Sequence, residues 1–139
     1  MRAFARAFLA ATRLTEASLH GSQLDPSDYD VLVTLAEAPA EGVRPSDLAE
    51  RVLLTKSGIT RLVDRLVERG LIERRVCPTD RRGQLVALTP RGRHLLRRAA
   101  PGLLRALGAA LGSLSVAELA AMKRSSERIA EAATEHSHE

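Results

Sequence analysis

The sequence predicts a mainly α-helical winged helix-turn-helix protein with a small β-hairpin wing and flanking dimerisation helices. Two short helical patterns joined by a tight connection are followed directly by a β-hairpin pattern, and long amphipathic patterns lie near both ends of the chain. We expect one domain in which residues 23–89 form the winged region, which the charge and motifs described below predict to be DNA-binding. Residues 1–22 and 90–139 then form a helical region with apolar stripes suited to dimerisation.

The composition is typical of one globular domain in a reducing compartment. The 139 residues are 45% hydrophobic, which is enough apolar material for a core. The single cysteine, Cys77, cannot close an intrachain disulfide. No run approaches the roughly 18 apolar residues of a membrane span, and arginines interrupt the N-terminal segment. We therefore expect a cytoplasmic protein with no membrane partner.

The first two helices are predicted from periodicity and capping. Apolar residues recur on one face of residues 2–19, which predicts an amphipathic helix. A second helix starts after Asp25, whose side chain can cap the first turn, with Pro26 at the first helical position. Asp28 places a negative charge in that turn, and the helix is expected to stop before Pro39.

The next two helices form the predicted helix-turn-helix. A short helix begins near Pro45, and Thr55 is the expected cap of a longer one. Apolar residues of the longer helix follow the i, i+3, i+4, i+7, i+8 spacing without interruption: Ile59, Leu62, Val63, Leu66 and Val67. Gly70 supplies a left-handed stop, after which Leu71 can close a Schellman motif.

The pattern then changes to that of a β-hairpin. Two strands are expected at residues 72–76 and 84–88, around a turn at 78–83 that is rich in turn-forming residues. A β-hairpin directly after a helix-turn-helix is a wing.

Two long helices complete the chain. The first is expected at residues 90–112, with a kink or break at Pro101 because an internal proline costs about 3 kcal/mol. The last begins with a capping box between Ser115 and Glu118 and continues to Ala133. These helices and the first one carry apolar stripes that need partners. A shared dimer core would cover the stripes, and packing within one chain is the alternative.

The positive charge is concentrated in the middle of the chain. Residues 44–98 contain 14 basic and six acidic residues, a net charge of +8, whereas the remainder carries −4. This distribution is typical of a module that binds a polyanion, although a solvated arginine-rich surface is an alternative. Only 2% of residues are aromatic, which argues against a platform for stacking single-stranded bases.

The polar face of residues 56–68 is the candidate recognition surface. Its first turn is small and polar, so the helix can approach base edges closely, and an arginine there can reach guanine O6 and N7. We expect Ser57, Thr60 and Arg61 to contact bases. Lys56 and Arg65, at the edges of this face, are expected to contact the DNA backbone. An ordinary charged surface helix is the alternative.

The wing supplies the second group of candidate contacts. Arg81 and Arg82 lie at its tip, from which an arginine can enter a narrow minor groove. Asp80 is expected to orient Arg82 or an arginine of the recognition helix, unless it only forms the turn. Three further arginines are expected to contact the DNA backbone: Arg44, Arg74 and Arg75.

The stretch RPSDLAERVLLTKSGITRLVDRLVERGLIERRVCPTDRRGQLVALTPRGR, at residues 44–93, resembles the MarR family of bacterial transcriptional regulators. DPSDYDVLVTLAEAP, at residues 25–39, is similar to that family's second helix, and the family's Asp-x-Arg wing pattern falls on Asp80 and Arg82. The resemblance implies a homodimer with intertwined first, fifth and sixth helices. It also implies recognition helices in successive major grooves, wing arginines in flanking minor grooves, and a small-molecule effector.

An effector would bind where the dimerisation helices meet the winged region. The residues expected to line that cleft are Phe8, Arg13, Glu16, His20, Tyr29 and Val31. An anionic or phenolic ligand would suit Arg13 and His20.

Other kinds of function have weaker support. A redox response would need Cys77, which has no second cysteine to resolve it. His136 and His138 lie in a polar tail that cannot hold a metal in a defined geometry, so no metal site or cofactor is expected. No motif of an enzyme occurs. The sequence therefore predicts a dimeric repressor that binds double-stranded DNA at a pseudo-palindromic operator. The alternatives are a redox-responsive regulator and a winged-helix protein-interaction module that does not bind DNA.

Overall fold

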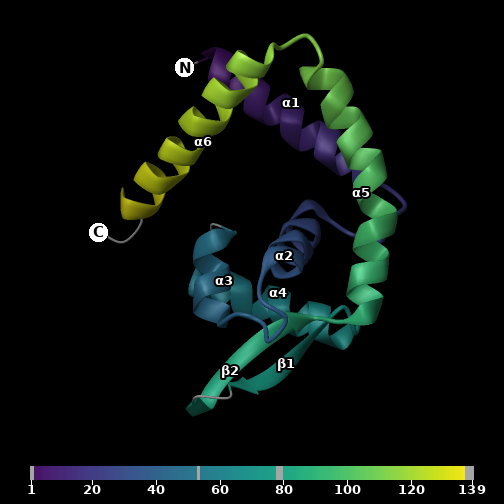
Figure 1. Ribbon diagram of the computed structural model, residues 1–139, viewed down its shortest axis with the longest axis vertical. Helices are drawn as coiled ribbons and strands as arrows, with labels where there is room; N and C mark the ends of the chain where they lie inside the picture. The colour runs from purple at the N-terminus through teal and green to yellow at the C-terminus, as the bar shows by residue number, and fades with distance from the viewer. Residues whose placement is uncertain (1, 53, 78–79, 137–139) are drawn as a thin grey trace.

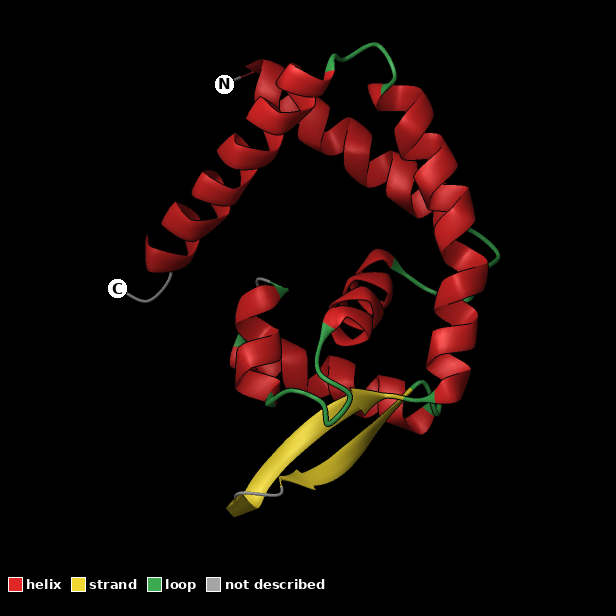
Figure 2. Cartoon of the chain, viewed as in Figure 1, coloured by secondary structure: helices red, strands yellow, loops and turns green. Residues whose placement is uncertain are grey.

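The computed structural model describes residues 2–52, 54–77 and 80–136, and it confirms the mainly α-helical winged fold (Figure 1, Figure 2). Six helices and one antiparallel hairpin are assigned within these residues. Their bounds are α1 Arg2–Leu19, α2 Pro26–Glu37, α3 Pro45–Arg51, α4 Lys56–Glu68, β1 Ile72–Cys77, β2 Asp80–Leu88, α5 Pro90–Leu111 and α6 Val116–His136.

The elements form two layers that α5 connects. Figure 1 shows α1, α6 and the end of α5 as an open frame, with α2, α3, α4 and the hairpin grouped below it. The core of the lower group contains fully buried side chains from four of its elements, namely Leu32, Leu48, Leu66 and Val86. Val43, between α2 and α3, adds an isolated antiparallel bridge to Val86. The same buried cluster continues into α1 and α5 through Leu19, Leu96 and Ala99, so the winged region and these helices share one hydrophobic core.

The predicted helix caps are present. The Asp25 side chain accepts a hydrogen bond from the Asp28 amide at 2.8 Å, and the Asp28 carboxylate accepts one from the Asp25 amide at 3.4 Å. At the start of α4, the Thr55 hydroxyl accepts from the Gly58 amide at 3.1 Å. These caps satisfy backbone amides that a first helical turn leaves without partners.

The end of α4 confirms the predicted Schellman motif. The Leu71 amide donates to the Leu66 carbonyl at 2.9 Å, and the Gly70 amide donates to the Val67 carbonyl at 2.8 Å. Gly70 has a φ of 68°, which a glycine adopts without the steric penalty of a side chain. The chain therefore turns sharply from α4 into β1.

The wing differs from the predicted hairpin near its tip. We expected a turn over residues 78–83, but β2 begins at Asp80 and β1 continues to Cys77. Val76 pairs with Gln84 while Cys77 pairs with Asp80, so residues 81–83 form an irregularity opposite the β1 strand. The turn-forming residues from Asp80 to Gly83 therefore belong to a longer, irregular strand, whereas residues 78–79 lie outside the described part of the chain.

Helix α5 continues through Pro101, so of the expected kink or break the break does not occur. Helix α1 lies close to α5 here. A Cβ added at Gly102, the residue after Pro101, would lie 3.6 Å from the Ser18 carbonyl oxygen of α1, which is an ordinary contact distance. Proline removes one helical hydrogen bond, and packing against a neighbouring helix offsets that loss.

Helix α6 begins with the predicted capping box. The Ser115 amide and hydroxyl donate to the Glu118 carboxylate at 2.8 and 2.7 Å, and the Glu118 amide donates back to the Ser115 hydroxyl at 3.3 Å. These hydrogen bonds lower the pKa of Glu118 below its ordinary value. The helix extends to His136, three residues beyond the expected end at Ala133.

Over the described residues, no single helix has the length and apolar character needed to cross a membrane. The strongly bent pair formed by α5 and residues 116–133 meets those two criteria only when the helices are taken together.

Candidate nucleic-acid interface

Helix α4 presents one face to the core and the opposite face to solvent. Ile59, Val63 and Leu66 are buried against α2, α3 and the hairpin base. Ser57, Thr60 and Arg61 are exposed on the outer face of the first two turns, as the sequence predicted. The Arg61 guanidinium makes no hydrogen bond or ion pair with a described residue, so its donors are available. The side chain of Lys56 lies outside the described residues.

Arg65 is held within the protein by two carboxylates. Its guanidinium donates to the Asp25 carboxylate at 2.8 Å and to the Asp28 carboxylate at 2.5 Å. The hydrogen bond to Asp28 is the main cause of a raised Arg65 pKa. Arg65 therefore joins α4 to the start of α2, although the sequence placed it among the DNA-backbone contacts.

Asp28 is the centre of a cluster that the sequence did not reveal. Its side chain is 2% exposed, and it accepts from Arg65 and from Arg69 at 2.6 Å. Arg69 also donates to the Gln23 backbone carbonyl in the linker after α1. The sequence indicated only a helix cap at Asp28. A further signal was the spacing of Arg65 and Arg69, which lie four residues apart at the end of α4 and so share one side of the helix. We call Asp28, Arg65, Arg69 and Gln23 the α2–α4 clamp.

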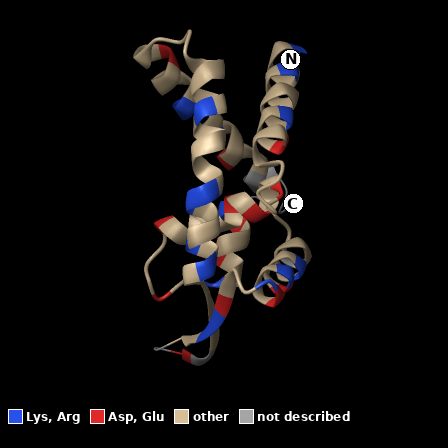
Figure 3. Cartoon of the chain, turned by 90° about the vertical axis from the view of Figure 1, so that its right-hand side faces the viewer, with Lys and Arg blue, Asp and Glu red and all other residues tan. Residues whose placement is uncertain are grey.

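The wing arginines near the hairpin base have carboxylate partners. Arg74 donates to Asp64 of α4 at 2.5 Å and to Gln84 at 3.0 Å. Arg75 donates to Glu73 and to the Ala40 backbone carbonyl, both at 2.6 Å. Figure 3 shows basic residues on this hairpin and along α5. These ion pairs orient the guanidinium groups before any nucleic acid arrives.

Asp80 has a described partner in Arg44, at 3.6 Å. This pair joins β2 of the wing to the residue before α3, and the expected role of Asp80 in orienting Arg82 or an arginine of the recognition helix stays a prediction. The side chains of Arg81 and Arg82 lie outside the described residues, so their predicted minor-groove role stays a prediction.

The residues expected to line one effector cleft are dispersed. Glu16 and His20 border one hollow beside the α2–α4 clamp, and Tyr29 borders another with Asp30 and Leu54. Burial raises the pKa of the Tyr29 hydroxyl.

The other three candidates are not in either hollow. Val31 is fully buried in the core, so this expectation is wrong for it. Phe8 and Arg13 are exposed on α1 and border neither hollow. These two hollows therefore do not bring all six candidates together, and a common effector cleft stays a prediction.

The alternative chemistries find little support in the geometry. Cys77, the single cysteine of the sequence, is only 7% exposed, which limits access by an oxidant. No group of three or more potential metal ligands occurs among the described residues. The His136 side chain and all of His138 lie outside that description.

The first turn of α4 is exposed and polar, it lies beside an antiparallel hairpin, and α3 and α4 form a tight helix-turn-helix. Together these features define a winged helix-turn-helix of the DNA-binding type. A family model described as MarR family matches residues 22–83. The chain belongs to the MarR family of transcriptional regulators, as the solved structures of similar proteins also show.

Three relatives illustrate the similarity. CouR from Rhodococcus jostii RHA1, solved with p-coumaroyl-CoA, is 32% identical with a TM-score of 0.84, and the match covers 91% of this chain and 87% of CouR. Sco3205 from Streptomyces coelicolor, solved in complex with DNA, is 30% identical with a TM-score of 0.85, covering 94% and 83%. The repressor YetL from Bacillus subtilis is 31% identical over 68% of this chain and 57% of its own length. The chain spans about half the length of the curated relatives it matches.

Proposed function

We propose that this protein is a dimeric repressor that recognises a pseudo-palindromic operator in double-stranded DNA. The observation that carries the proposal is the exposed first part of α4, where Ser57, Thr60 and Arg61 face solvent beside the wing. Small side chains let a helix approach base edges, and one bidentate arginine–guanine pair contributes about 1–3 kcal/mol of discrimination. That Sco3205 was solved with DNA supports this reading.

The remaining contacts position the protein on the duplex. Arg82 at the wing enters the minor groove, with Arg81 beside it. The residues assigned to the DNA backbone are Arg44, Lys56, Arg65, Arg74 and Arg75. Arg44, Arg65, Arg74 and Arg75 each have a carboxylate partner within the protein, and their side chains are 36–49% exposed.

Dimerisation accounts for the apolar surface of the upper frame. Phe4 and Phe8 of α1, Leu104 of α5 and Ile129 of α6 are all exposed. Every described residue of α6 whose burial is known, other than Leu119 and Ala130, is exposed as well. Such helices need a partner, and a second copy of the chain offers the same apolar faces. A two-fold dimer would place two recognition helices on two half-sites.

An anionic or phenolic effector relieves repression in this proposal. CouR, which was solved with a phenolic thioester of coenzyme A, supports that ligand class. In this chain the hollow bordered by Glu16 and His20 lies beside the α2–α4 clamp, so a ligand there would touch residues that position α4. A thermal-shift panel of phenolic acids and their coenzyme A thioesters tests the idea, and no shift with any member would remove it.

Selection from a library of random double-stranded DNA tests the main proposal. We expect enrichment of an inverted repeat with half-sites about 10 base pairs apart. Affinity should fall with salt by about 0.9 log units per phosphate contact per log unit of salt concentration. Binding without sequence enrichment or salt dependence would favour the protein-interaction alternative.

Two alanine variants then separate the assigned roles. Arg61→Ala should lose about 1–3 kcal/mol of discrimination at one base position, measured by competition with single-base variants of the selected site. Arg74→Ala should weaken selected and random duplexes equally, because a phosphate contact carries no sequence information. Equal losses for both variants on both duplexes would contradict the assignment.

A further inference from the structure

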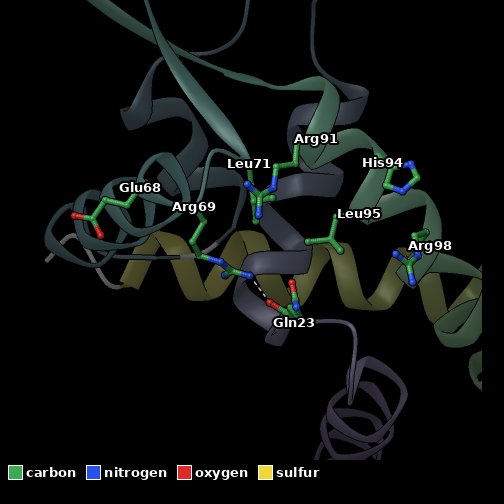
Figure 4. A pocket seen from close by; sticks show the side chains of 8 residues that line it. All are labelled: Gln23, Glu68, Arg69, Leu71, Arg91, His94, Leu95 and Arg98. Atoms are coloured by element: carbon green, nitrogen blue, oxygen red, sulfur yellow. Dashed lines mark hydrogen bonds between the residues drawn. The ribbon is translucent and has the colours of Figure 1, made fainter.

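A hollow of about 360 Å³ lies where the end of α4 meets the first turns of α5 (Figure 4). Its border includes Gln23, Arg69, Leu71, Arg91, His94 and Arg98. We propose that this hollow binds a compact multivalent anion through phosphate or carboxylate groups. None of the residues expected to line the effector cleft borders it, so the site goes beyond the proposed function.

The basic side chains of α5 converge on the hollow from one face of the helix. Arg91, His94 and Arg98 fall at i, i+3 and i+7, which places them on one side of an α-helix, and Figure 4 shows them in a row along α5. None of the three makes a hydrogen bond or ion pair with a described residue. In the same region Arg74 and Arg75 are each paired with a carboxylate. The donors on α5 therefore remain available to a ligand.

Electrostatics within α5 disfavour this arrangement in the absence of an anion. The first nine residues of the helix contain four arginines and one histidine, with no acidic residue. Like charges three or four residues apart on a helix repel one another, and positive charge near a helix N-terminus opposes the helix dipole. A bound anion would relieve both effects.

The opposite side of the hollow completes the site. Arg69 of α4 borders it and is held in place by Asp28 and the Gln23 carbonyl. Three arginines thus border one concave space: Arg91 and Arg98 have no described ion pair, and Arg69 is paired with Asp28, while Glu68 is the lining carboxylate. Leu71 and Leu95 provide an apolar border. The volume is within the range of small-ligand sites, and a concave shape favours a small anion over a DNA strand lying across the surface.

Isothermal titration with pyrophosphate and with citrate, at constant ionic strength, tests the proposal. We expect saturable binding of at least one probe, and the stronger probe identifies phosphate or carboxylate as the preferred group. The double variant Arg91→Gln/Arg98→Gln should weaken it at least tenfold. Arg93→Gln/Arg97→Gln is the matched control, because it removes the same charge from the same turns at residues that do not border the hollow. This control should bind as the wild type does.

Three results would overturn the proposal. One is the absence of saturable binding for both probes. Another is an equal loss in both double variants, which would indicate diffuse attraction to the helix. The third is a selective loss of duplex binding in Arg91→Gln/Arg98→Gln without any probe binding, which would assign these arginines to DNA. Circular dichroism of each variant, and Arg91→Lys/Arg98→Lys as a charge-conserving variant, separate loss of the site from loss of the fold.

Discussion

At the scale of single residues, Asp28 links the start of α2 to the recognition helix. Its buried carboxylate accepts from the Asp25 amide and from two arginines of α4. Burying a charge is costly unless it is paired and hydrogen-bonded, and here both conditions are met. The Asp28 carboxylate therefore adds a buried polar link between α2 and α4 to their apolar packing and to the ion pair of Arg65 with Asp25.

Asp28→Asn should lower the free energy of unfolding by about 1–3 kcal/mol, because the amide keeps the helix cap but weakens the hydrogen bonds to Arg65 and Arg69. We expect a loss of stability in the lower part of this range, because the side chains of Arg65 and Arg69 are partly exposed to solvent. Urea denaturation measures the change.

The matched control is Asp64→Asn, which breaks the exposed ion pair with Arg74. Exposed pairs contribute about 0–1 kcal/mol, so this variant should be nearly neutral. An equal loss in Asp28→Asn and Asp64→Asn would contradict the special role of the buried carboxylate.

The sequence predicted the local part of this arrangement and missed the rest. The cap at Asp25 and Asp28 depends on residues three apart, which a linear pattern reveals. The arginines that bind Asp28 lie 37 and 41 residues further along the chain, and only the packed fold brings them there. For the same reason, the sequence did not reveal that Asp25 and Asp28 bind Arg65, or that Glu16 and Tyr29 border separate hollows.

At the scale of elements, the junction of α4, β1 and α5 is tightly packed. The Thr89 hydroxyl donates to the Gly70 and Leu71 carbonyls and accepts from the Gly92 amide at 3.0 Å. A Cβ at Gly92 would lie 2.0 Å from the Leu71 carbonyl oxygen, which is far inside any allowed contact. Only glycine lets the start of α5 approach the end of α4 so closely.

Gly92→Ala should therefore destabilise the protein by about 1–3 kcal/mol or more through overpacking against the backbone. Gly102→Ala, in the same helix, adds its Cβ at an ordinary contact distance. That control should be neutral or stabilise by about 0.5–1 kcal/mol, because alanine favours a helix over glycine. Thermal unfolding of both variants checks the difference, and a destabilised Gly102→Ala would show that the helix cannot accept either side chain.

Element bounds followed from the sequence where caps and periodicity were strong. Helix α1 matched its predicted residues 2–19, and the end of α4 matched the predicted Schellman motif. The start of β2 at Asp80 and the continuity of α5 were not predicted, because turn-forming residues from Asp80 to Gly83 lie within the strand and α1 lies against α5 beside Pro101. Both errors arise where tertiary contacts override a local preference.

At the scale of the whole molecule, the exposed apolar side chains of the upper frame predict self-association. Phe8→Ser with Leu104→Ser removes two side chains that are 64% and 63% exposed in one chain. If a second copy covers them, the loss of about 1.5–3 kcal/mol for each should weaken the dimer at least tenfold. Analytical ultracentrifugation measures the dissociation constant.

Val76→Ser provides the control, since Val76 is 69% exposed on the wing, away from the frame. This variant should associate as the wild type does. A monomeric wild-type protein, or equal weakening by Val76→Ser, would contradict the proposed dimer surface.

The unbroken course of α5 has a mechanical consequence. One end of the helix packs against the winged region through Leu96, and the other end belongs to the frame proposed to dimerise. A continuous helix acts as a torsionally stiff rod, so inserting one residue beyond Gly102 would rotate one end against the other by about 100°. Each winged lobe would still fold, but the two recognition helices would be out of phase with a single DNA duplex. An insertion of seven residues, close to two full turns, would restore the phase and change only the span.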